Sequence, residues 1–442
     1  MTETVDKFGS NEDGEFGIAP SGPRKSFPIE LLPKTAKISD GRVSIAGVDL
    51  GWLANEVGTP FFVYDEEHIR TVMRRLKNSF VGEVAYASKA FLCRELARIV
   101  NEEGLFLDVA TQGEIFVALS AGFPASRMIF HGNNKSSEEL RFALEVGVGR
   151  VVVDSFDELD RLDTLASGPV RVWIRVTPGV EAHTHEYVMT GQEDSKFGFS
   201  FNSGAAERAI KRVLDSPNLV LVGLHCHIGS QILRLESYRA AIEVMAVLVR
   251  RYELAELNIG GGLGVPYVGG EEAPSLEEWV SELGRYAEQA GISSAVRLHI
   301  EPGRSIIAQA AVTVYRAGTI KRLEGIRTYV SVDGGMSDNP RPVLYGSGYD
   351  TLLVERAEDV ATEIFCISGK HCESGDILVR EALLPADLAV GELIATPVTG
   401  AYGYSMASNY NKVLRPPVVF VKDGKHRVVV RRESLDDLLR LE

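Results

Sequence analysis

From about residue 83 to residue 301, short apolar runs alternate with amphipathic helical stretches, and this alternation constrains the fold more than any other feature. It is typical of parallel βα units, in which each strand is followed by a helix that covers the sheet. The expected strands are EVAYAS ending before Lys89, LFLDVA at 105–110, RMIFH at 127–131, VVVD at 151–154, VRVWIRV at 170–176, LVLVGLHCH at 219–227, LAELNI at 254–259 and VRLHIE at 296–301. Eight such strands predict an α/β fold with a (β/α)8 TIM-type barrel.

Helix signals lie between the expected strands. Ser136 to Glu139 and Ser155 to Glu158 both read S-x-x-E, the capping box in which serine and glutamate side chains satisfy free backbone amides at a helix start. Gly104 lies where a helix needs a glycine after its last turn. These signals agree with helices between the strands.

The remaining segments divide the chain further. Residues 1–26 are rich in Gly, Asp, Glu, Ser and Pro and predict a flexible acidic tail. Residues 27–58 contain a hairpin signal at Asp40-Gly41 and are expected to contribute to a β domain. The barrel is expected at 59–306. Residues 307–442 read as antiparallel strands with glycine-containing turns, ending in a short amphipathic helix, and predict a mostly antiparallel C-terminal β domain.

The balance of charge narrows the class of partner. The chain has 442 residues with 47 basic and 61 acidic side chains, a formal charge of −14, so we expect no nucleic-acid and no membrane partner. No apolar stretch reaches the roughly 18 residues that a spanning helix needs, and the acidic start is unlike a signal peptide, which predicts a cytoplasmic protein. Four cysteines without C-x-x-C spacing fit neither a disulfide framework nor a structural zinc site.

Polar side chains fall at the carboxyl ends of the expected strands, where barrel enzymes carry their chemistry. They are Lys89, Asp108, His131, Asp154, Arg175, His227, Gly260–Gly262 and Glu301. The amine of Lys89 would reach the barrel mouth and could form a Schiff base. A lysine that simply reaches solvent is the alternative, and position alone favours it. The polar residues at the other strand ends make the Schiff-base interpretation the favoured one.

Residues 258–264, NIGGGLG, follow an expected strand, so their backbone amides could wrap a phosphate group. No G-K-[S/T] follows, and Val265 occupies the place of the third glycine in a G-x-G-x-x-G motif. A plain turn is the commoner explanation of a glycine run. On the late strands of a barrel, however, a phosphate site is the expected use.

Glu301, in the sequence EPGR, ends the last expected strand, opposite Lys89. A carboxylate there can keep a heteroaromatic nitrogen protonated and so make the ring a strong electron sink. The alternative is an internal ion pair between Glu301 and Arg304.

The run His225-Cys226-His227 allows a metal site, because alternate residues of a strand point to one side and two imidazoles could share an ion. His131 and Asp154 at neighbouring strand ends keep this alternative open, but the rest of a ligand set is missing and we expect no metal. One histidine stacked on a flat cofactor fits the pattern equally well. His183 and His185 are expected to be solvated in a loop.

A lysine, a glycine-rich phosphate loop and an acidic partner for a ring nitrogen on one barrel together resemble the fold type III pyridoxal-phosphate decarboxylases, whose fold is alanine racemase-like. The resemblance covers the chain apart from its tail. More narrowly, the chain is similar to the diaminopimelate decarboxylase family in YASKAF, LDVAT-GE, HGNNK, EAHTHEY, K-FGFS, GLHCHIGSQ, GGGLG, EPGR, DGGMSDNPRP-LYG, CESGD and TGAYGY.

The resemblance implies the cofactor pyridoxal 5'-phosphate, bound by Lys89, with His227 stacked on its ring and Glu301 at the pyridine nitrogen. The other implied cofactor-binding residues are Asp108, Ser230, Gly260, Gly261, Gly262, Gly303, Arg304 and Tyr402. The implied substrate-binding residues are Arg304, Arg341, Tyr345, Glu373 and Tyr402. Catalysis would use Lys89, His227 and Cys372, the last as the acid that protonates the carbanion. In this family the CESGD loop enters a partner's site, which implies a homodimer with composite active sites.

The residues give a separate reason to expect a diamino diacid as substrate. The far end of diaminopimelate carries a carboxylate and an ammonium, and Arg341 with Glu373 can bind this pair. An ornithine-type substrate has only an ammonium there, which Arg341 would repel. We therefore expect decarboxylation of meso-2,6-diaminopimelate to L-lysine and CO2, the last step of lysine biosynthesis.

Four rival functions remain. An ornithine- or arginine-type decarboxylase is disfavoured by Arg341. A metal-dependent barrel hydrolase would use His225 and His227. A racemase of this fold places an arginine at the ring nitrogen, which weakens the electron sink that Glu301 would strengthen. A catalytically silent relative typically loses the lysine or the proton donor, and this chain keeps both.

Overall fold

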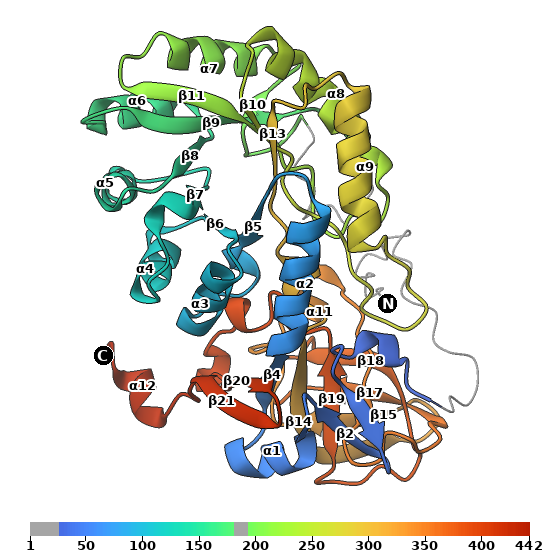
Figure 1. Cartoon of the computed structure of the whole chain (residues 1–442). Coiled ribbons are helices and arrows are strands. Elements are labelled where there is room, and N and C mark those ends of the chain that lie inside the picture. The colour runs from blue at the N-terminus through green and yellow to red at the C-terminus, as the bar shows by residue number, and fades with distance from the viewer. Residues whose placement is uncertain (1–25, 181–192) are drawn as a thin grey trace, which may run out of the picture.

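Eight parallel strands close into a barrel in the computed structural model, which describes residues 26–180 and 193–442 (Figure 1). Each strand is hydrogen-bonded to the next, and β13 pairs with β5 to close the circle. The strands are β5 (Glu83–Ala87), β6 (Phe106–Val109), β7 (Met128–Phe130), β8 (Arg150–Val153), β9 (Val170–Thr177), β11 (Leu219–His225), β12 (Glu256–Asn258) and β13 (Arg297–Ile300). All eight predicted strands and the predicted fold class are confirmed.

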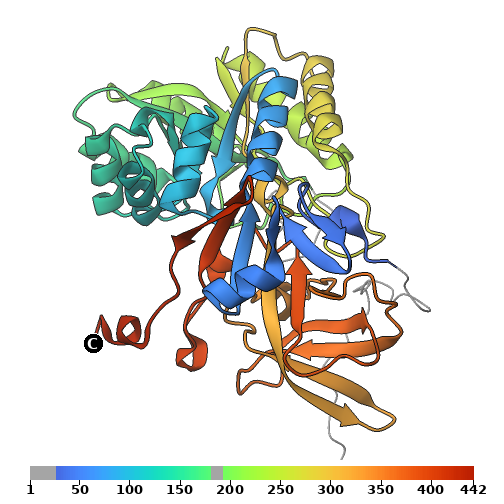
Figure 2. The same cartoon turned by 60° about the horizontal axis from the view of Figure 1, so that its bottom comes forward.

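Helices cover the outside of the barrel (Figures 1 and 2). They are α2 (Glu66–Ser79), α3 (Arg94–Glu102), α4 (Gln112–Ser120), α5 (Ser137–Val146), α6 (Phe156–Leu165), α7 (Ala205–Leu214), α8 (Glu236–Arg251) and α9 (Leu276–Gln289). Gly104 follows α3 with a positive φ of 74°, as predicted for a residue that ends a helix. Within the described ranges, no helix combines the length and the apolar composition needed to cross a membrane.

The two predicted capping boxes differ in outcome. At α5, Ser136 and Glu139 exchange both hydrogen bonds of the box. At α6, Ser155 accepts from the amide of Glu158, but the Glu158 carboxylate binds Lys135 and the amide that precedes Ser155 instead. The second box is therefore only half formed, because a buried lysine competes for the same carboxylate.

The interior of the barrel is filled rather than open. Arg150 donates two hydrogen bonds of 2.7 Å to the carboxylate of Glu256, and the indole of Trp173 donates a third of 2.8 Å. All three side chains are buried, as is His299, whose Nε2 lies 3.9 Å from the same carboxylate. This group lies toward the starts of β8 and β12, which leaves the carboxyl ends of the strands for a site.

A second, mostly antiparallel sheet lies beneath the barrel in Figure 1. Its central strand, β14 (Ala311–Leu323), pairs antiparallel with β4, β15 and β19. The strands are β4 (Phe61–Asp65), β15 (Arg327–Val332), β16 (Leu352–Leu353), β17 (Glu363–Ser368), β18 (Ile377–Leu384), β19 (Leu393–Pro397), β20 (Val418–Lys422) and β21 (Lys425–Val430). The predicted terminal helix is confirmed as α12 (Leu435–Leu439).

The N-terminal part forms a small antiparallel sheet of its own, with β1 (Lys37–Ser39), β2 (Arg42–Ile45) and β3 (Val48–Asp49), followed by α1 (Leu50–Val57). Asp40 and Gly41 make the predicted hairpin turn, with φ values of 52° and 75°. Hydrogen bonds from the amide of Val43 to the carbonyl of Val354, and from Ala357 to Gly41, attach this sheet to the C-terminal part.

The sequence places residues 59–306 in the barrel, whereas β4 lies in the second sheet, between β14 and β20. Its residues, FFVYD, are buried throughout. A short apolar run suits either sheet, so its composition does not indicate which strands it pairs with. The predicted tail, residues 1–26, falls outside the described residues except for its last one, and the other domain boundaries stay predictions.

Candidate active site

Lys89 lies in a single 3-10 turn, Ser88–Ala90, immediately after β5. Its side chain is accessible to solvent although its neighbours Ser88 and Ala90 are buried. Desolvation opposes the charge of the amine, but the negative potential of Tyr402, Asp108 and Glu301 outweighs it and raises the pKa of Lys89. The amine therefore stands in an accessible space at the barrel mouth, among groups from several strand ends.

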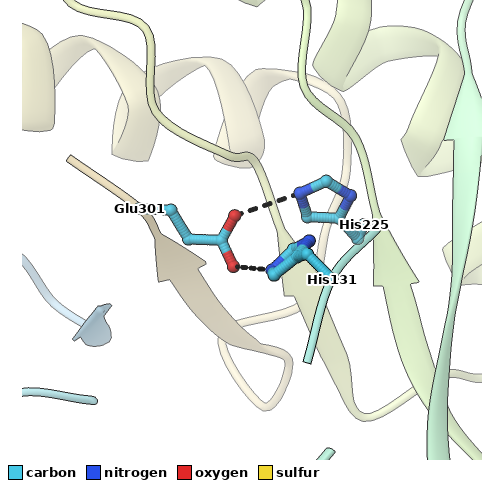
Figure 3. A group of neighbouring side chains, drawn as sticks. All are labelled: His131, His225 and Glu301. Atoms are coloured by element: carbon cyan, nitrogen blue, oxygen red, sulfur yellow. Dashed lines mark hydrogen bonds and ion pairs between the residues drawn. The ribbon is translucent and has the colours of Figure 1, made fainter. Parts of the chain in front are cut away.

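Glu301 is held by donors at the ends of three other strands, and Figure 3 shows two of them, His131 and His225. Its Oε1 accepts from His131 Nε2 at 2.8 Å and from Asn258 Nδ2 at 2.7 Å, and its Oε2 accepts from His225 Nε2 at 3.1 Å. Since β13 is the neighbour of β5, Glu301 lies beside the strand of Lys89 rather than opposite it. Desolvation opposes ionisation, but the two histidines hold the pKa of Glu301 well below its usual range.

Asp108 extends this group on the next strand. Its Oδ1 lies 3.8 Å from Nε2 of His131, and burial raises the pKa of Asp108 to about 6. The same histidine is desolvated, yet the carboxylates of Asp108 and Glu301 raise its pKa. Nε2 of His131 thus faces two buried carboxylates, both of which favour the charged form of the imidazole.

The glycine run packs too closely for side chains. Gly260 and Gly262 have φ values of 77° and 106°, and a methyl group on Gly261 would lie less than 3.0 Å from the carbonyl oxygen of Glu301. The amide of Gly261 donates to Nδ1 of His227 at 3.3 Å. Only glycine fits this backbone, here called the glycine cradle, because a side chain on any of the three residues would meet the backbone of a neighbouring strand end.

Arg304 joins the cradle from the other side. One of its terminal nitrogens donates to Ser230 Oγ at 2.8 Å, another bonds the hydroxyl of Tyr267, and its guanidinium lies 4.9 Å from the ring of Tyr402. Its buried Nε has no hydrogen-bond partner among the described residues. The alternative of an ion pair between Glu301 and Arg304 is wrong, because Arg304 binds these hydroxyls instead.

Arg341 begins α11 (Arg341–Tyr345), and only 5% of it is exposed. Its Nε donates to the hydroxyl of Tyr349 at 2.9 Å, and its guanidinium lies 4.7 Å from the ring of Tyr267 and 6.0 Å from that of Tyr402. Tyr345 lies 5.7 Å from the same guanidinium. Two buried arginines therefore share Tyr267 and Tyr402 at one edge of the cradle.

Cys372 and Glu373 lie apart from this group, on an exposed loop after β17. The amide of Cys372 donates to Asn411 Oδ1 at 3.2 Å, and Glu373 accepts from the hydroxyl of Tyr410 at 3.0 Å. Buried Asp376 fixes the base of the loop by accepting from the amides of Met336 and His371. The loop thus presents a thiol and a carboxylate outward.

The pair His225 and His227 does not form the metal site that the alternation allowed. The strand ends at His225, and in the described part of the chain the group whose ligand atoms lie within 4.8 Å of one another is His131, His225 and Glu301. Hydrogen bonds of 2.8 and 3.1 Å account for this group without an ion. His183 and His185 lie outside the described residues.

Sequence reasoning did not find several members of the site. Asn258 and the pairing of His131 and His225 with Glu301 were missed, as were Tyr267 and Tyr349 around the arginines. Asn258 ends a predicted strand, so the strand-end rule could have found it. Tyr267 lies nine residues beyond the end of β12, and Tyr349 lies outside the barrel, so neither falls directly at a strand end where the rule would find it.

A model of the pyridoxal binding domain of pyridoxal-dependent decarboxylases matches residues 66–308. The diaminopimelate decarboxylase of Staphylococcus aureus is 46% identical over 414 residues, which cover 90% of this chain and 97% of that protein. The chain belongs to the diaminopimelate decarboxylase family. The Bacillus subtilis member of the family is 44% identical and covers 91% of the chain and 95% of that protein. A crystal structure of the M. jannaschii diaminopimelate decarboxylase in complex with L-lysine has a TM-score of 0.86, with 30% identity, and covers 93% of this chain and 98% of that one.

The residues of this diaminopimelate decarboxylase family member fit pyridoxal phosphate, the cofactor that its family uses. Glycines without side chains, the hydroxyl of Ser230 and the unpartnered Nε of Arg304 make an anion cradle. Lys89 offers an accessible amine, and Glu301 offers an ionised carboxylate beside it. Phosphate, aldehyde and ring nitrogen each find a group of matching chemistry.

Proposed function

We propose that this protein removes one carboxylate of meso-2,6-diaminopimelate as CO2 and releases L-lysine, using pyridoxal 5'-phosphate. The observation that carries the proposal is the meeting of Lys89, the glycine cradle and ionised Glu301 beside two buried arginines in a chain of this family. Because the product is a protein-building amino acid, we place the reaction in the cytoplasm.

On the cofactor side, Lys89 is the residue that binds pyridoxal phosphate covalently. His227 would hold the ring, and Ser230, Gly260–Gly262, Gly303, Arg304 and Tyr402 would hold the phosphate. When bound, the cofactor supplies a sink for the electron pair that departing CO2 leaves behind. Glu301 holds a proton at the ring nitrogen, because its carboxylate stays ionised. Asp108 supports the charge of the neighbouring His131.

On the substrate side, Arg341 binds the carboxylate that is not removed. Its burial and its ring of tyrosines keep water away from the guanidinium, which strengthens a charged hydrogen bond. Tyr345, Tyr402 and Arg304 complete this side of the site. Ornithine- or arginine-type substrates lack the distal carboxylate, so they would leave Arg341 buried without an anion. This difference favours diaminopimelate over ornithine or arginine as the substrate.

The proton donor is Cys372, acting on a partner subunit's site in a homodimer with two composite active sites. Two observations support this arrangement: Cys372 and Glu373 are both exposed, and the Glu373 carboxylate accepts from the hydroxyl of Tyr410 within its own loop region rather than from a group of the barrel mouth. Placed in the partner's site, Cys372 Sγ donates a proton to the carbon that lost CO2, and Glu373 binds the distal ammonium. Exposure keeps the loop free to reach that site.

The substrate is tested by incubating the purified protein and pyridoxal phosphate with meso-diaminopimelate, ornithine, arginine or L-lysine, and identifying products by mass spectrometry. Lysine from diaminopimelate alone is expected. Cadaverine, putrescine or agmatine as the main product would overturn the assignment in favour of a simpler basic amino acid.

The composite site is tested by subunit mixing. Lys89→Ala and Cys372→Ala homodimers are each expected to be inactive, because each lacks one part of both sites. After exchange of subunits, a mixed dimer contains one complete site, so activity returns. Absence of any recovery, although mass spectrometry detects the mixed dimer, would contradict the partner role of Cys372.

A further inference from the structure

The carboxylate of Glu301 accepts more hydrogen bonds from the protein than it needs in order to bind a ring nitrogen. Donors reach it from β7, β11 and β12, and Asn258, His225 and His131 are all buried. Oε1 accepts from His131 and Asn258, and Oε2 accepts from His225; Figure 3 shows the two histidines with Glu301. A carboxylate has about four acceptor positions, so the oxygen with capacity left is mainly Oε2.

The two histidines differ in charge. His225 donates through Nε2, and its buried Nδ1 has no hydrogen-bond partner among the described residues. A protonated ring would bury an unpaired N–H at Nδ1, which is unfavourable. Burial accordingly lowers the pKa of His225 to about 4. His225 is a neutral donor.

His131 faces a different surrounding. Its Nε2 lies 2.8 Å from Glu301 Oε1 and 3.8 Å from Asp108 Oδ1, whereas the charge of Arg175 opposes its protonation and the ring of His225 lies 4.8 Å away, edge to face. The two carboxylates outweigh desolvation and raise the pKa of His131. A positive charge so close to Oε1 stabilises the ionised form of Glu301. It repels a protonated ring nitrogen less strongly, because that nitrogen would bind the other oxygen, Oε2, farther from His131.

We propose that His131 and His225 are positioning residues with separate tasks: His131 supplies the charge that keeps Glu301 ionised, and His225 supplies the neutral hydrogen bond that fixes its orientation. The inference rests on the proposed function, in which Glu301 is the partner of the ring nitrogen. Its consequence is that the proton between the ring nitrogen and Glu301 stays on the ring nitrogen. The strength of the electron sink is therefore set by two histidines that do not react themselves.

Amide variants separate charge from hydrogen bonding. His131→Gln keeps a donor and removes the charge, so it is expected to move the shared proton toward Glu301. His225→Gln keeps a neutral donor and is expected to rescue most of the defect of His225→Leu. The control is His299→Gln: His299 is equally buried and also faces a glutamate, Glu256, but inside the barrel.

The direct readout is the 15N NMR shift of the ring nitrogen in protein loaded with 15N-labelled pyridoxal phosphate. We expect the protonated-ring position in the parent, His225→Gln and His299→Gln, and a shift toward the unprotonated position in His131→Gln and His225→Leu. With the substrate, kcat of His131→Gln falls roughly tenfold to a hundredfold while KM changes little, because the loss is confined to the electron sink.

A parent-like ring shift in His131→Gln, or an equal displacement in both glutamine variants, would overturn the division of tasks. If His131→Gln does not fold, Asp108→Asn removes the anion that supports the charge of His131 and is expected to move the ring shift the same way; an unmoved shift there also refutes the proposal. The NMR measurement requires only bound cofactor. It therefore still decides the inference if the substrate proves to be another amino acid.

Discussion

Replacing Gly261 by alanine perturbs the site through the backbone alone. The added methyl group would lie less than 3.0 Å from the carbonyl oxygen of Glu301, whereas ordinary contacts begin near 3.4 Å. Relief requires the ends of β12 and β13 to separate by about 1 Å, because packed interiors offer little room for smaller adjustments. That carbonyl belongs to Glu301 itself, and Arg304 follows three residues later, so both groups move with it.

The expected magnitude follows from the clash. Overpacking of this kind costs about 1–3 kcal/mol. The apoprotein can relax to relieve this strain, but cofactor binding restores it. Binding is therefore weakened by roughly tenfold to a hundredfold. A displacement of about 1 Å between Glu301 and the bound ring lowers kcat by on the order of a hundredfold more. Both losses come from one methyl group that carries no charge.

The assay is a titration of apoprotein with pyridoxal phosphate, followed by absorbance, together with thermal unfolding. The matched control is Gly284→Ala in α9, where no atom lies within 4 Å of the new methyl group. That change is expected to stabilise the fold by about 0.5–1 kcal/mol, because alanine suits a helix better than glycine, and to leave cofactor binding unchanged. Binding within twofold of the parent in Gly261→Ala would refute the reasoning.

Three further outcomes are expected. Lys89→Ala abolishes turnover and the visible absorption of bound pyridoxal phosphate together, and retained activity would rule out its covalent role. Arg341→Met raises KM for diaminopimelate by roughly tenfold to a hundredfold without harming ornithine binding, since a hydrogen bond to a charged group contributes about 1.5–3 kcal/mol; steady-state kinetics on both substrates checks this. Burial lowers the pKa of His68 to about 3, so the unfolded chain binds more protons than the folded one below the ordinary value of 6.5. Its contribution to stability therefore falls by about 2 kcal/mol between pH 7 and pH 5, and His68→Gln flattens that slope in denaturant unfolding.

The barrel could be predicted because its eight strands are local patterns of apolar residues, each readable in isolation. Lys89, the glycine run and Glu301 followed from the same rule, since strand ends of a barrel converge wherever the strands are. The partners of Glu301 did not follow, because His131, His225 and Asn258 lie 170, 76 and 43 positions away and only closure of the barrel makes them neighbours.

Competition between side chains for the same partners, and pairing between distant strands, explain the other differences between the predicted and the observed structure. The carboxylate of Glu158 fits a capping box by sequence, but buried Lys135 needs an anion more than the backbone amide of Ser155 does. β4 is an apolar run like the barrel strands, and only its register with β14 places it in the second sheet. Tyr267 and Tyr402 approach Arg304 from different parts of the fold, which no spacing in the sequence encodes.

The central claim is that this site decarboxylates diaminopimelate by means of its cofactor. Its most direct test measures CO2 and L-lysine together while pyridoxal phosphate is titrated into apoprotein at saturating meso-diaminopimelate. The account predicts that both products appear in equal amounts and reach a maximum at one cofactor per chain. Lysine without matching CO2, or fully loaded protein that releases neither, would contradict it.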